Sequence, residues 1–210
     1  MKHIYIVGAG GFGREVFDWM METFDFIKEY SFAGFLDDNL QALDEFSIEA
    51  KVAGKISDYQ AGENDYLICA IGSPEVKKEV CHLLISKGGK FISLIHPSAK
   101  LGRGSSIGKG SVICPNVVIT CDVELGDFVM VNLSTTLGHD SKVGNWSTLS
   151  AHCDVTGFVE VGEMVFMGSG ARIIPRKKVG ASSIIGAGSV VIRDVSSKTS
   201  VFGNPARSIF

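Results

Sequence analysis

One adjacent pair of polar residues, His139 and Asp140, is suited to acid–base chemistry. A histidine can accept a proton near neutral pH, and a neighbouring carboxylate can fix its tautomer and stabilise the imidazolium that forms. Such a pair needs no protein nucleophile when the substrate itself attacks. The alternative interpretation is an ordinary solvated pair of polar residues at a turn.

The element that must position this pair is a repeat of six residues. Every sixth residue from Ile95 to Val191 is aliphatic, a run of seventeen hexads without insertion. A small or β-branched residue usually follows four places later, and glycine often follows the aliphatic residue directly. This period fits neither a helix nor a series of hairpins. It predicts a three-sided parallel β-helix, with aliphatic and small side chains inside and glycine at corners of unusual φ. His139 and Asp140 then project from a corner.

Other polar residues of the repeat have roles that the sequence leaves open. His152 lies two faces further round the coil than His139, so the two should not meet within one chain, although they could across a subunit interface. Zinc needs about three or four converging ligands, and the repeat has too few, so no metal site is expected. A basic cluster could be a solvated face or could bind coenzyme phosphates. Its members are Arg172, Arg176, Lys177, Lys178 and Arg193.

The residues before the repeat show a different, α/β pattern. An apolar run at 4–7 leads into G-x-G-x-x-G at 8–13 and then an apolar-periodic helix, an order that predicts phosphate at a helix N-terminus. The alternatives are tight strand–helix packing and a nicotinamide site, which is less favoured because no second nucleotide-binding half follows. A strand at 32–36 ends at Asp37 and Asp38, which could read a ribose or base, or be a solvated turn. A strand at 66–71, a helix at 75–86 and a strand at 90–94 follow.

We therefore expect two domains, a Rossmann-like domain over residues 1–94 and a β-helix with its tail over 95–210. The net charge of −3 gives no indication of attraction to nucleic acid or membrane. Apolar runs are too short for a membrane-spanning helix or a signal peptide. The five cysteines contain no C-x-x-C motif, which predicts a reduced cytoplasmic protein.

Six segments resemble one family in order and spacing. They are GAGGFGREV at 8–16, FLDD at 35–38, IGSP at 71–74, IHPSA at 95–99, GHD at 138–140 and GNPAR at 203–207. Together they resemble the sialic acid O-acetyltransferase NeuD family and its close relative PglD, the N-acetyltransferases of nucleotide-linked 4-amino sugars. The likeness covers essentially the whole chain, and its β-helix is similar to that of the hexapeptide-repeat acyltransferases.

This resemblance implies a left-handed β-helix, a homotrimer and acetyl-CoA as co-substrate. It implies that His139 is the general base, that Asp140 orients it, and that the Gly157 N–H stabilises the acetyl carbonyl oxygen. Acetyl-CoA would lie between two subunits near Asn132, Gly157, Gly168, Ser169, Gly170, Ala171, Gly186, Ala187, Gly203, Asn204 and Pro205. The nucleotide sugar would contact Gly8, Gly10, Gly11, Phe12, Gly13, Asp37, Asp38, Gly72 and Ser73.

The chain departs from this family at two places. Some relatives have a second histidine nine residues after the base, where this chain has Thr148, and many have Gly-Asp-Asn in place of Gly72-Ser73-Pro74. We expect N-acetylation of a nucleotide-linked amino sugar by direct transfer. O-acetylation of a sugar hydroxyl, as in sialic acid, and a non-catalytic scaffold or nucleotide sensor are the alternatives. The nucleotide, the sugar and the acyl group stay open.

Overall fold

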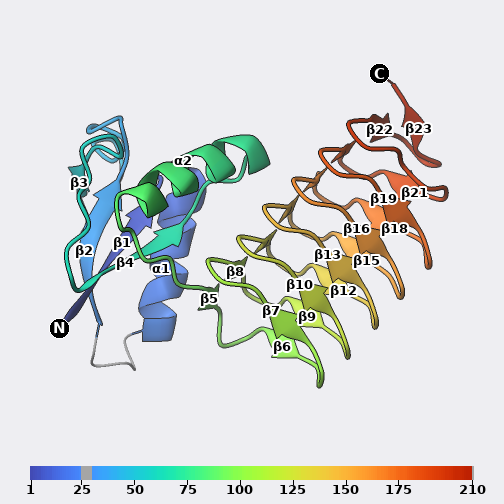
Figure 1. Ribbon diagram of the computed structural model, residues 1–210, viewed down its shortest axis with the longest axis horizontal. Coiled ribbons are helices and arrows are strands. Elements are labelled where there is room, and N and C mark those ends of the chain that lie inside the picture. The colour runs from blue at the N-terminus through green and yellow to red at the C-terminus, as the bar shows by residue number, and fades with distance from the viewer. Residues whose placement is uncertain (25–29, 210) are drawn as a thin grey trace.

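The structure, a computed structural model, describes residues 1–24 and 30–209 and has two parts (Figure 1). An N-terminal α/β part lies against one end of a long three-sided β-helix, and the C-terminus lies at the other end. The predicted fold class, an α/β domain followed by a parallel β-helix, is confirmed.

The α/β part is a four-stranded parallel sheet in the order β3-β2-β1-β4. Its elements are β1 (Lys2–Val7), α1 (Gly11–Phe24), β2 (Tyr30–Leu36), β3 (Val52–Gly54), β4 (Asp65–Cys69) and α2 (Pro74–Ser86). The chain moves from β1 to β2 and β3 on one side, and then returns to place β4 on the other side. In open α/β sheets ligands bind at the carboxyl ends of the strands beside such a reversal, which here lies between β1 and β4.

The strand predicted over residues 90–94 does not form. Phe91 makes a single bridge to Leu67, and Leu94 already pairs with Val112 of the β-helix. The apolar side chains of this segment are half-buried or buried at the junction instead, where Phe91 contacts Phe128 with ring centroids 5.2 Å apart. The segment therefore connects the two parts, and its apolar character reflects the junction.

The β-helix consists of short strands in three sheets, which we call faces 1, 2 and 3. Face 1 contains β5 (Leu94–Ile95), β8 (Val112–Ile113), β11 (Met130–Val131), β14 (Thr148–Leu149), β17 (Phe166–Met167), β20 (Ile184–Ile185), β22 (Ser200–Phe202) and the antiparallel β23 (Arg207–Ser208). Face 2 contains β6 (Lys100–Leu101), β9 (Val118–Ile119), β12 (Thr136–Leu137), β15 (Asp154–Val155), β18 (Arg172–Ile173) and β21 (Val190–Val191). Face 3 contains β7 (Ser106–Ile107), β10 (Glu124–Leu125), β13 (Lys142–Val143), β16 (Glu160–Val161) and β19 (Lys178–Val179).

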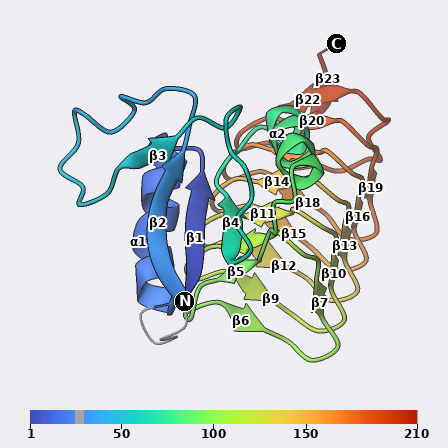
Figure 2. The same ribbon diagram turned by 60° about the vertical axis from the view of Figure 1, so that its left-hand side comes forward.

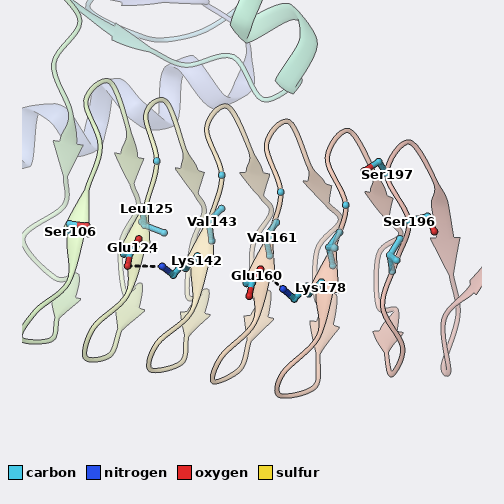
Figure 3. A pocket seen from close by; sticks show the side chains of 16 residues that line it. Ser106, Glu124, Leu125, Lys142, Val143, Glu160, Val161, Lys178, Ser196 and Ser197 are labelled. Carbon is cyan, nitrogen blue, oxygen red and sulfur yellow. Dashed lines mark ion pairs between the residues drawn. The ribbon is translucent and has the colours of Figure 1, made fainter.

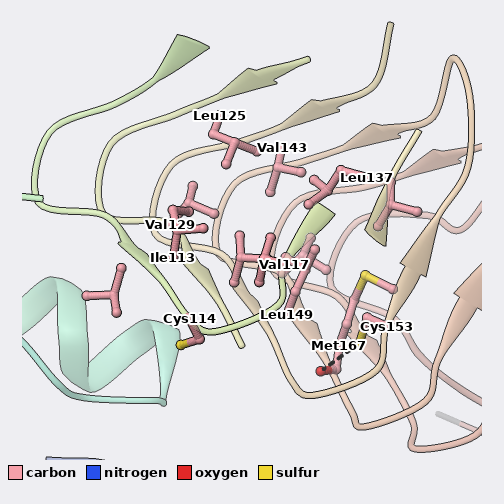
Figure 4. Close-up of a cluster of buried hydrophobic side chains, with 14 of the residues drawn as sticks. Ile113, Cys114, Val117, Leu125, Val129, Leu137, Val143, Leu149, Cys153 and Met167 are labelled. Atoms are coloured by element: carbon pink, nitrogen blue, oxygen red, sulfur yellow. Dashed lines mark hydrogen bonds between the residues drawn. The ribbon is translucent and has the colours of Figure 1, made fainter. Parts of the chain in front are cut away.

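Each coil contains eighteen residues, because Glu124 pairs with Lys142 and Lys142 pairs with Glu160. The aliphatic residue of every hexad ends a strand, and from Ile113 to Val191 it is buried inside the prism, as the sequence predicts. The small residue two places earlier also points inward, so that Val117 and Ile119 are both buried. Figure 4 shows this filled interior. We name the edges between faces by the faces that they join: edge 1/2, edge 2/3 and edge 3/1.

The glycines that directly follow the aliphatic residues do not carry the unusual φ of the corners, and glycine occupies the positive-φ position in some corners only, at Gly104, Gly110, Gly170 and Gly188. Positive φ falls two residues after the glycine position, at residues such as Asp140 (58°), Trp146 (65°) and His152 (59°). Glycine is needed for close approach between coils, because a Cβ built on Gly138 would lie 2.7 Å from the backbone nitrogen of Gly157. The side chain on the positive-φ residue is therefore free to vary from corner to corner.

The two parts meet where α2 and β4 lie nearest to the β-helix (Figure 2). Phe128 and Trp146, from successive coils on edge 3/1, stack with ring centroids 4.2 Å apart and pack against Cys69 and Cys81. Lys77 of α2 is 1% exposed and reaches the β-helix, donating from Nζ to Ser147 O at 3.1 Å and to Thr148 Oγ1 at 3.0 Å. Aromatic packing and a buried ammonium therefore join the two parts.

Candidate active site

His139 and Asp140 lie on edge 2/3, in the corner that joins β12 to β13. Nδ1 of His139 lies 2.8 Å from Oδ2 of Asp140. Because an ionised carboxylate only accepts hydrogen bonds, Nδ1 carries the proton and Nε2 is left as a proton acceptor. The side chains are 54% and 44% exposed, so both project outward from the prism.

The next coil packs directly against the imidazole of His139. A Cβ built on Gly157 would lie 2.7 Å from both Cε1 and Nε2 of the ring, so glycine leaves the space that the imidazole occupies. Phe158 meets the imidazole at a steep angle, with centroids 5.1 Å apart. The guanidinium of Arg176, one coil further, lies 4.4 Å from the Phe158 centroid. Successive coils thus support the orientation of the imidazole.

The N–H of Gly157, in the next corner along the same edge, has no acceptor among the described residues. The backbone ladder of the coil does not need the N–H of this position, since Pro115 and Pro175 occupy it in other hexads and have none, although at Lys109 and Asp127 this N–H donates to a side chain. The edge therefore presents a proton acceptor, Nε2 of His139, together with a free backbone donor. Acyl transfer uses groups of these two kinds, a base and an oxyanion donor.

The hydrogen bonds beneath the His139 corner are incomplete. In another corner the final serine, Ser111, donates to Gly126 O at 3.2 Å and accepts from the N–H of Val129 at 3.0 Å. The equivalent hydroxyl of Ser141 is buried, and no group in residues 1–24 and 30–209 is its partner. The corner at His139 therefore lacks a side-chain link to the next coil.

Most of the residues that the resemblance assigns to acetyl-CoA lie on edge 1/2. Asn132 comes first, and two coils further follow Gly168, Ser169, Gly170 and Ala171, then in the next coil Gly186 and Ala187, and finally Gly203, Asn204 and Pro205 of the tail. Within the described chain the N–H groups of Ser169 and Ala187 have no acceptor. This edge therefore presents a row of small residues and free backbone donors.

Face 2 separates this row from His139. A face contains six residues, which span up to about 20 Å when extended. Gly157 alone of the residues assigned to acetyl-CoA lies beside His139. One chain therefore does not bring the row on edge 1/2 together with the imidazole.

The residues assigned to the nucleotide sugar gather at the carboxyl ends of β1 and β4. The loop at 8–13 follows β1, and Gly72 and Ser73 follow β4, so both loops border the reversal of the sheet. Ser73 is also the N-cap of α2, because its Oγ accepts from Val76 N. Phe12 packs against Trp19 with ring centroids 6.1 Å apart. The two loops adjoin, since a Cβ built on Gly8 would lie 3.2 Å from Ala70 O, and we call the ligand position expected between them the crevice.

The two carboxylates after β2 have different environments. Asp37 accepts from the N–H of Ala9 at 2.8 Å and from the N–H of Asn39 at 2.9 Å, so it holds the glycine loop in place. Asp38 accepts one longer bond, 3.4 Å, from Ser57 N. Asp38 is therefore the carboxylate with more capacity left for a ligand.

A comparison with protein families matches residues 3–84 to the family described as the PglD N-terminal domain. Residues 3–84 of the chain are therefore similar to a PglD N-terminal domain. The resemblance to PglD-like proteins is thereby confirmed for the part of the chain that contains the crevice.

Solved structures extend this likeness beyond the PglD N-terminal domain to the β-helix. The acetyltransferase domain of PglB from Neisseria gonorrhoeae FA1090 is 27% identical, with a TM-score of 0.89 and 100% of each chain covered. PerB from Caulobacter crescentus, solved in complex with CoA and GDP-perosamine, is 27% identical with a TM-score of 0.89, covering 100% of this chain and 98% of PerB.

Curated proteins match over shorter stretches. UDP-N-acetylbacillosamine N-acetyltransferase of Bacillus subtilis (strain 168) is 32% identical over 117 residues, 54% of this chain. The chain spans 51% of that protein and 24% of an uncharacterised protein of Acanthamoeba polyphaga mimivirus, L142. It therefore covers about half or less of the length of these curated relatives.

Lys77, which links the PglD N-terminal domain to the β-helix, was not among the residues singled out from the sequence. Burial lowers the pKa of its ammonium from 10.5 to about 8. The sequence signal that could have identified Lys77 as buried is its spacing, since Lys77, Cys81 and Leu84 form one buried stripe of α2. Its partner Thr148 occupies the position at which some relatives have histidine, and here this position is buried under the PglD N-terminal domain.

The remaining polar candidates are dispersed over the β-helix. His152 lies on edge 1/2 and lines a shallow hollow with Asp154 and Arg172. Lys178 pairs with Glu160 at 3.0 Å, so its charge is already balanced. In the described ranges no group of three or more potential metal ligands occurs, and neither α1 nor α2 has the length and apolar character to cross a bilayer.

A long open groove on face 3 is a different kind of surface (Figure 3). Its outward side chains alternate in charge along the prism, and they pair as Lys142 with Glu124 at 2.9 Å and as Lys178 with Glu160. The residues that line it include no histidine or cysteine. The charges along this groove therefore neutralise one another in pairs, and it contains no histidine that could act as a base.

Proposed function

We propose that this chain is an acetyl-CoA-dependent N-acetyltransferase that acts on the amino group of a nucleotide-linked amino sugar. The observation that carries the proposal is the His139–Asp140 pair at 2.8 Å, with the free N–H of Gly157 on the same edge one coil further. The relatives support this assignment, since PerB was solved with CoA and GDP-perosamine and the Bacillus protein is named for bacillosamine N-acetylation.

In the proposed reaction the neutral amine attacks the thioester carbonyl, and Nε2 of His139 takes the proton that the amine loses. Asp140 orients the ring and stabilises its protonated form. The Gly157 N–H donates to the carbonyl oxygen as it becomes negative; such donors contribute about 10²–10³ in rate. As the carbon–sulfur bond breaks, the proton passes from His139 to the sulfur, leaving CoA and the acetamido sugar.

A homotrimer completes this site in our proposal. Because edge 1/2 and His139 do not meet within one chain, a neighbouring protomer would place its edge 1/2 against His139. The free N–H groups of Ser169 and Ala187 suit the amide carbonyls of an extended pantetheine arm. Sedimentation as a monomer at working concentration would contradict this assembly.

The crevice of the PglD N-terminal domain is the proposed site of the nucleotide. It favours a nucleotide-bearing acceptor over a free sugar acid, because a free sugar acid needs no phosphate site. We place the reaction in the cytoplasm, where the five cysteines, all free thiols, would stay reduced.

Thiol release from acetyl-CoA, measured with a panel of acceptors, tests the proposed function. The panel contains UDP-, dTDP- and GDP-linked amino sugars, with sialic acid as the hydroxyl acceptor. Release with amino sugars alone is the expected result. Release with sialic acid would indicate O-acetylation instead, and no release with any acceptor would indicate a non-catalytic role.

A further inference from the structure

Arg14 follows the glycine loop directly, and the mechanism above does not use it. Its guanidinium carbon lies 3.4 Å from the centroid of the Phe46 ring, so the two planes have van der Waals contact. In the described part of the chain Arg14 forms no ion pair, and its Nε is buried without a hydrogen-bond partner. A guanidinium with an aromatic partner and no carboxylate keeps its capacity to bind an anion.

The position of this cation is electrostatically unfavourable without an anion. Arg14 lies in the first turn of α1, which contains no acidic residue and is the positive end of the helix dipole. The N–H groups of Gly11, Phe12 and Gly13 have no acceptor within the described ranges. Nη2 of Arg14 lies 3.9 Å from a Cβ built on Gly11. A side-chain cation and backbone donors therefore gather at one place, where an anion would reduce their repulsion.

The space next to these donors is open. Gly10 and Gly72, one in each loop of the crevice, lie outside the left-handed region of φ, and a Cβ built on either would meet no atom within 4 Å. The fold therefore does not require glycine at these two positions, and its presence leaves the backbone accessible. Phe46, 43% exposed, comes from the segment between β2 and β3 and so approaches from the other side of β1.

We propose that Arg14, stacked on Phe46, binds the diphosphate of the nucleotide sugar and so favours nucleotide-linked acceptors over free sugars. This inference rests on the proposed function and adds a residue to its substrate site. The planar N–H groups of arginine match phosphate oxygens in a bidentate geometry, and the N-terminal N–H groups of α1 complete the contacts. Stacking on Phe46 reduces the freedom that the guanidinium loses on binding. Arg14 contacts the phosphates, so its contribution to affinity does not depend on the nucleotide base.

Calorimetric titration of the purified full chain with UDP, GDP and dTDP, in the absence of acetyl-CoA, tests this role. Arg14→Gln is expected to weaken the best-bound diphosphate at least tenfold and to reduce the dependence of its affinity on salt. Arg14→Lys is expected to lose part of this affinity, because lysine keeps the positive charge but lacks the planar, bidentate N–H groups of the guanidinium. Phe46→Leu is expected to give an intermediate loss. Arg103→Gln, an exposed arginine at a β-helix corner, is the matched control.

Equal diphosphate affinity in the wild type and Arg14→Gln would overturn the role of Arg14 and leave the proposed acetyl transfer intact. A weaker affinity with an unchanged salt dependence would also overturn it, because that result indicates a structural role. If only the proposed function fails, a diphosphate still binds in an Arg14-dependent manner, but no acceptor gives CoA release. A wild-type chain that binds none of the three diphosphates would overturn both.

Discussion

His139 and Trp146 stand in consecutive corners of one coil, and the two corners have the same backbone but opposite surroundings. Each contains a residue of positive φ, Asp140 at 58° and Trp146 at 65°. Trp146 is 8% exposed and stacks on Phe128 where the β-helix meets the α/β part, whereas the imidazole of His139 projects into solvent. One repeat therefore builds a structural corner on edge 3/1 and a candidate reactive corner on edge 2/3.

The hydrogen bonds of the serine that ends each corner differ in the same way. Ser147, below Trp146, donates to Gly162 O at 2.8 Å and accepts from Val165 N at 3.0 Å. Ser141, below His139, has neither bond within the described residues. The serine hydrogen bonds to the next coil are thus present at the structural corner and absent at the corner that carries the candidate base.

The largest expected effect tests the structural corner. Trp146→Ala should lower the free energy of unfolding by about 3–5 kcal/mol, because it removes a buried aromatic side chain from the junction. Turnover of the folded protein should stay within a few-fold of wild type, since Trp146 lies on another edge than His139. Denaturant titration and steady-state kinetics measure the two quantities. Phe158→Ala, 41% exposed at the positive-φ position of edge 2/3, is the control, with a loss of about 1 kcal/mol or less.

The candidate reactive corner should respond in the opposite way. His139→Ala is expected to lower kcat at least a hundredfold, about 2.7 kcal/mol in barrier height, because the amine loses its base. The KM for acetyl-CoA should stay within a few-fold, and so should the free energy of unfolding. His3→Ala removes the histidine of another His–Asp pair, 3.4 Å from Asp65, and should leave kcat unchanged. Wild-type turnover in His139→Ala would remove His139 from the mechanism.

Lys77 provides a pH test of the junction beneath Trp146. Its pKa is about 8 in the folded chain and 10.5 as the reference value, so between these values the unfolded chain binds more protons. Its contribution to the free energy of unfolding therefore rises with pH across this window, by about 2–3 kcal/mol in total. Lys77→Met should lack this rise.

Urea titrations of both proteins at pH 7.5 and pH 10 measure the difference. A hydrogen bond with Cys81 lowers the pKa of Cys69 and the charge of Lys77 contributes to this lowering, so the comparison reports the lysine together with its interaction with this thiol. Parallel behaviour of wild type and Lys77→Met over this range would show that the lysine is not buried as an ammonium.

The smallest effect compares the two kinds of serine. Ser111→Ala should cost about 1–2 kcal/mol in the free energy of unfolding, because it leaves an N–H and a carbonyl without their partner. Ser141→Ala should cost nothing or stabilise slightly, since that hydroxyl is already buried without a bond. Equal losses for the two variants would show that Ser141 has a hydrogen bond in solution.

The β-helix could be predicted because its information is local and repeated. Each aliphatic hexad residue ends a strand, and the position of His139 at a corner follows by counting from Leu137. The residue that carries positive φ could not be assigned in this way, since Asp140, Trp146 and His152 share no side-chain character. The three-residue strand β3 was missed because Val52–Gly54 has no period of its own.

The long-range contacts could not be predicted from spacing. Lys77 reaches Ser147 across seventy residues, and Asp37 reaches Ala9 across twenty-eight. Such bonds depend on how the two parts dock and on how loops close, which hydrophobic periodicity does not encode. The resemblance supplied the role of Gly157, whereas the unpartnered hydroxyl of Ser141 became visible only with its neighbours in place.

Because a coil contains eighteen residues, distances along the prism are fixed by the number of coils. Neighbouring coils are about 4.8 Å apart, so the separation along the prism between the histidine corner and the C-terminal turn is counted in whole steps. Deleting eighteen residues between them would shorten that separation by one step and keep every strand in register. Deleting six would turn the downstream corners by one face and move the turn to a different edge.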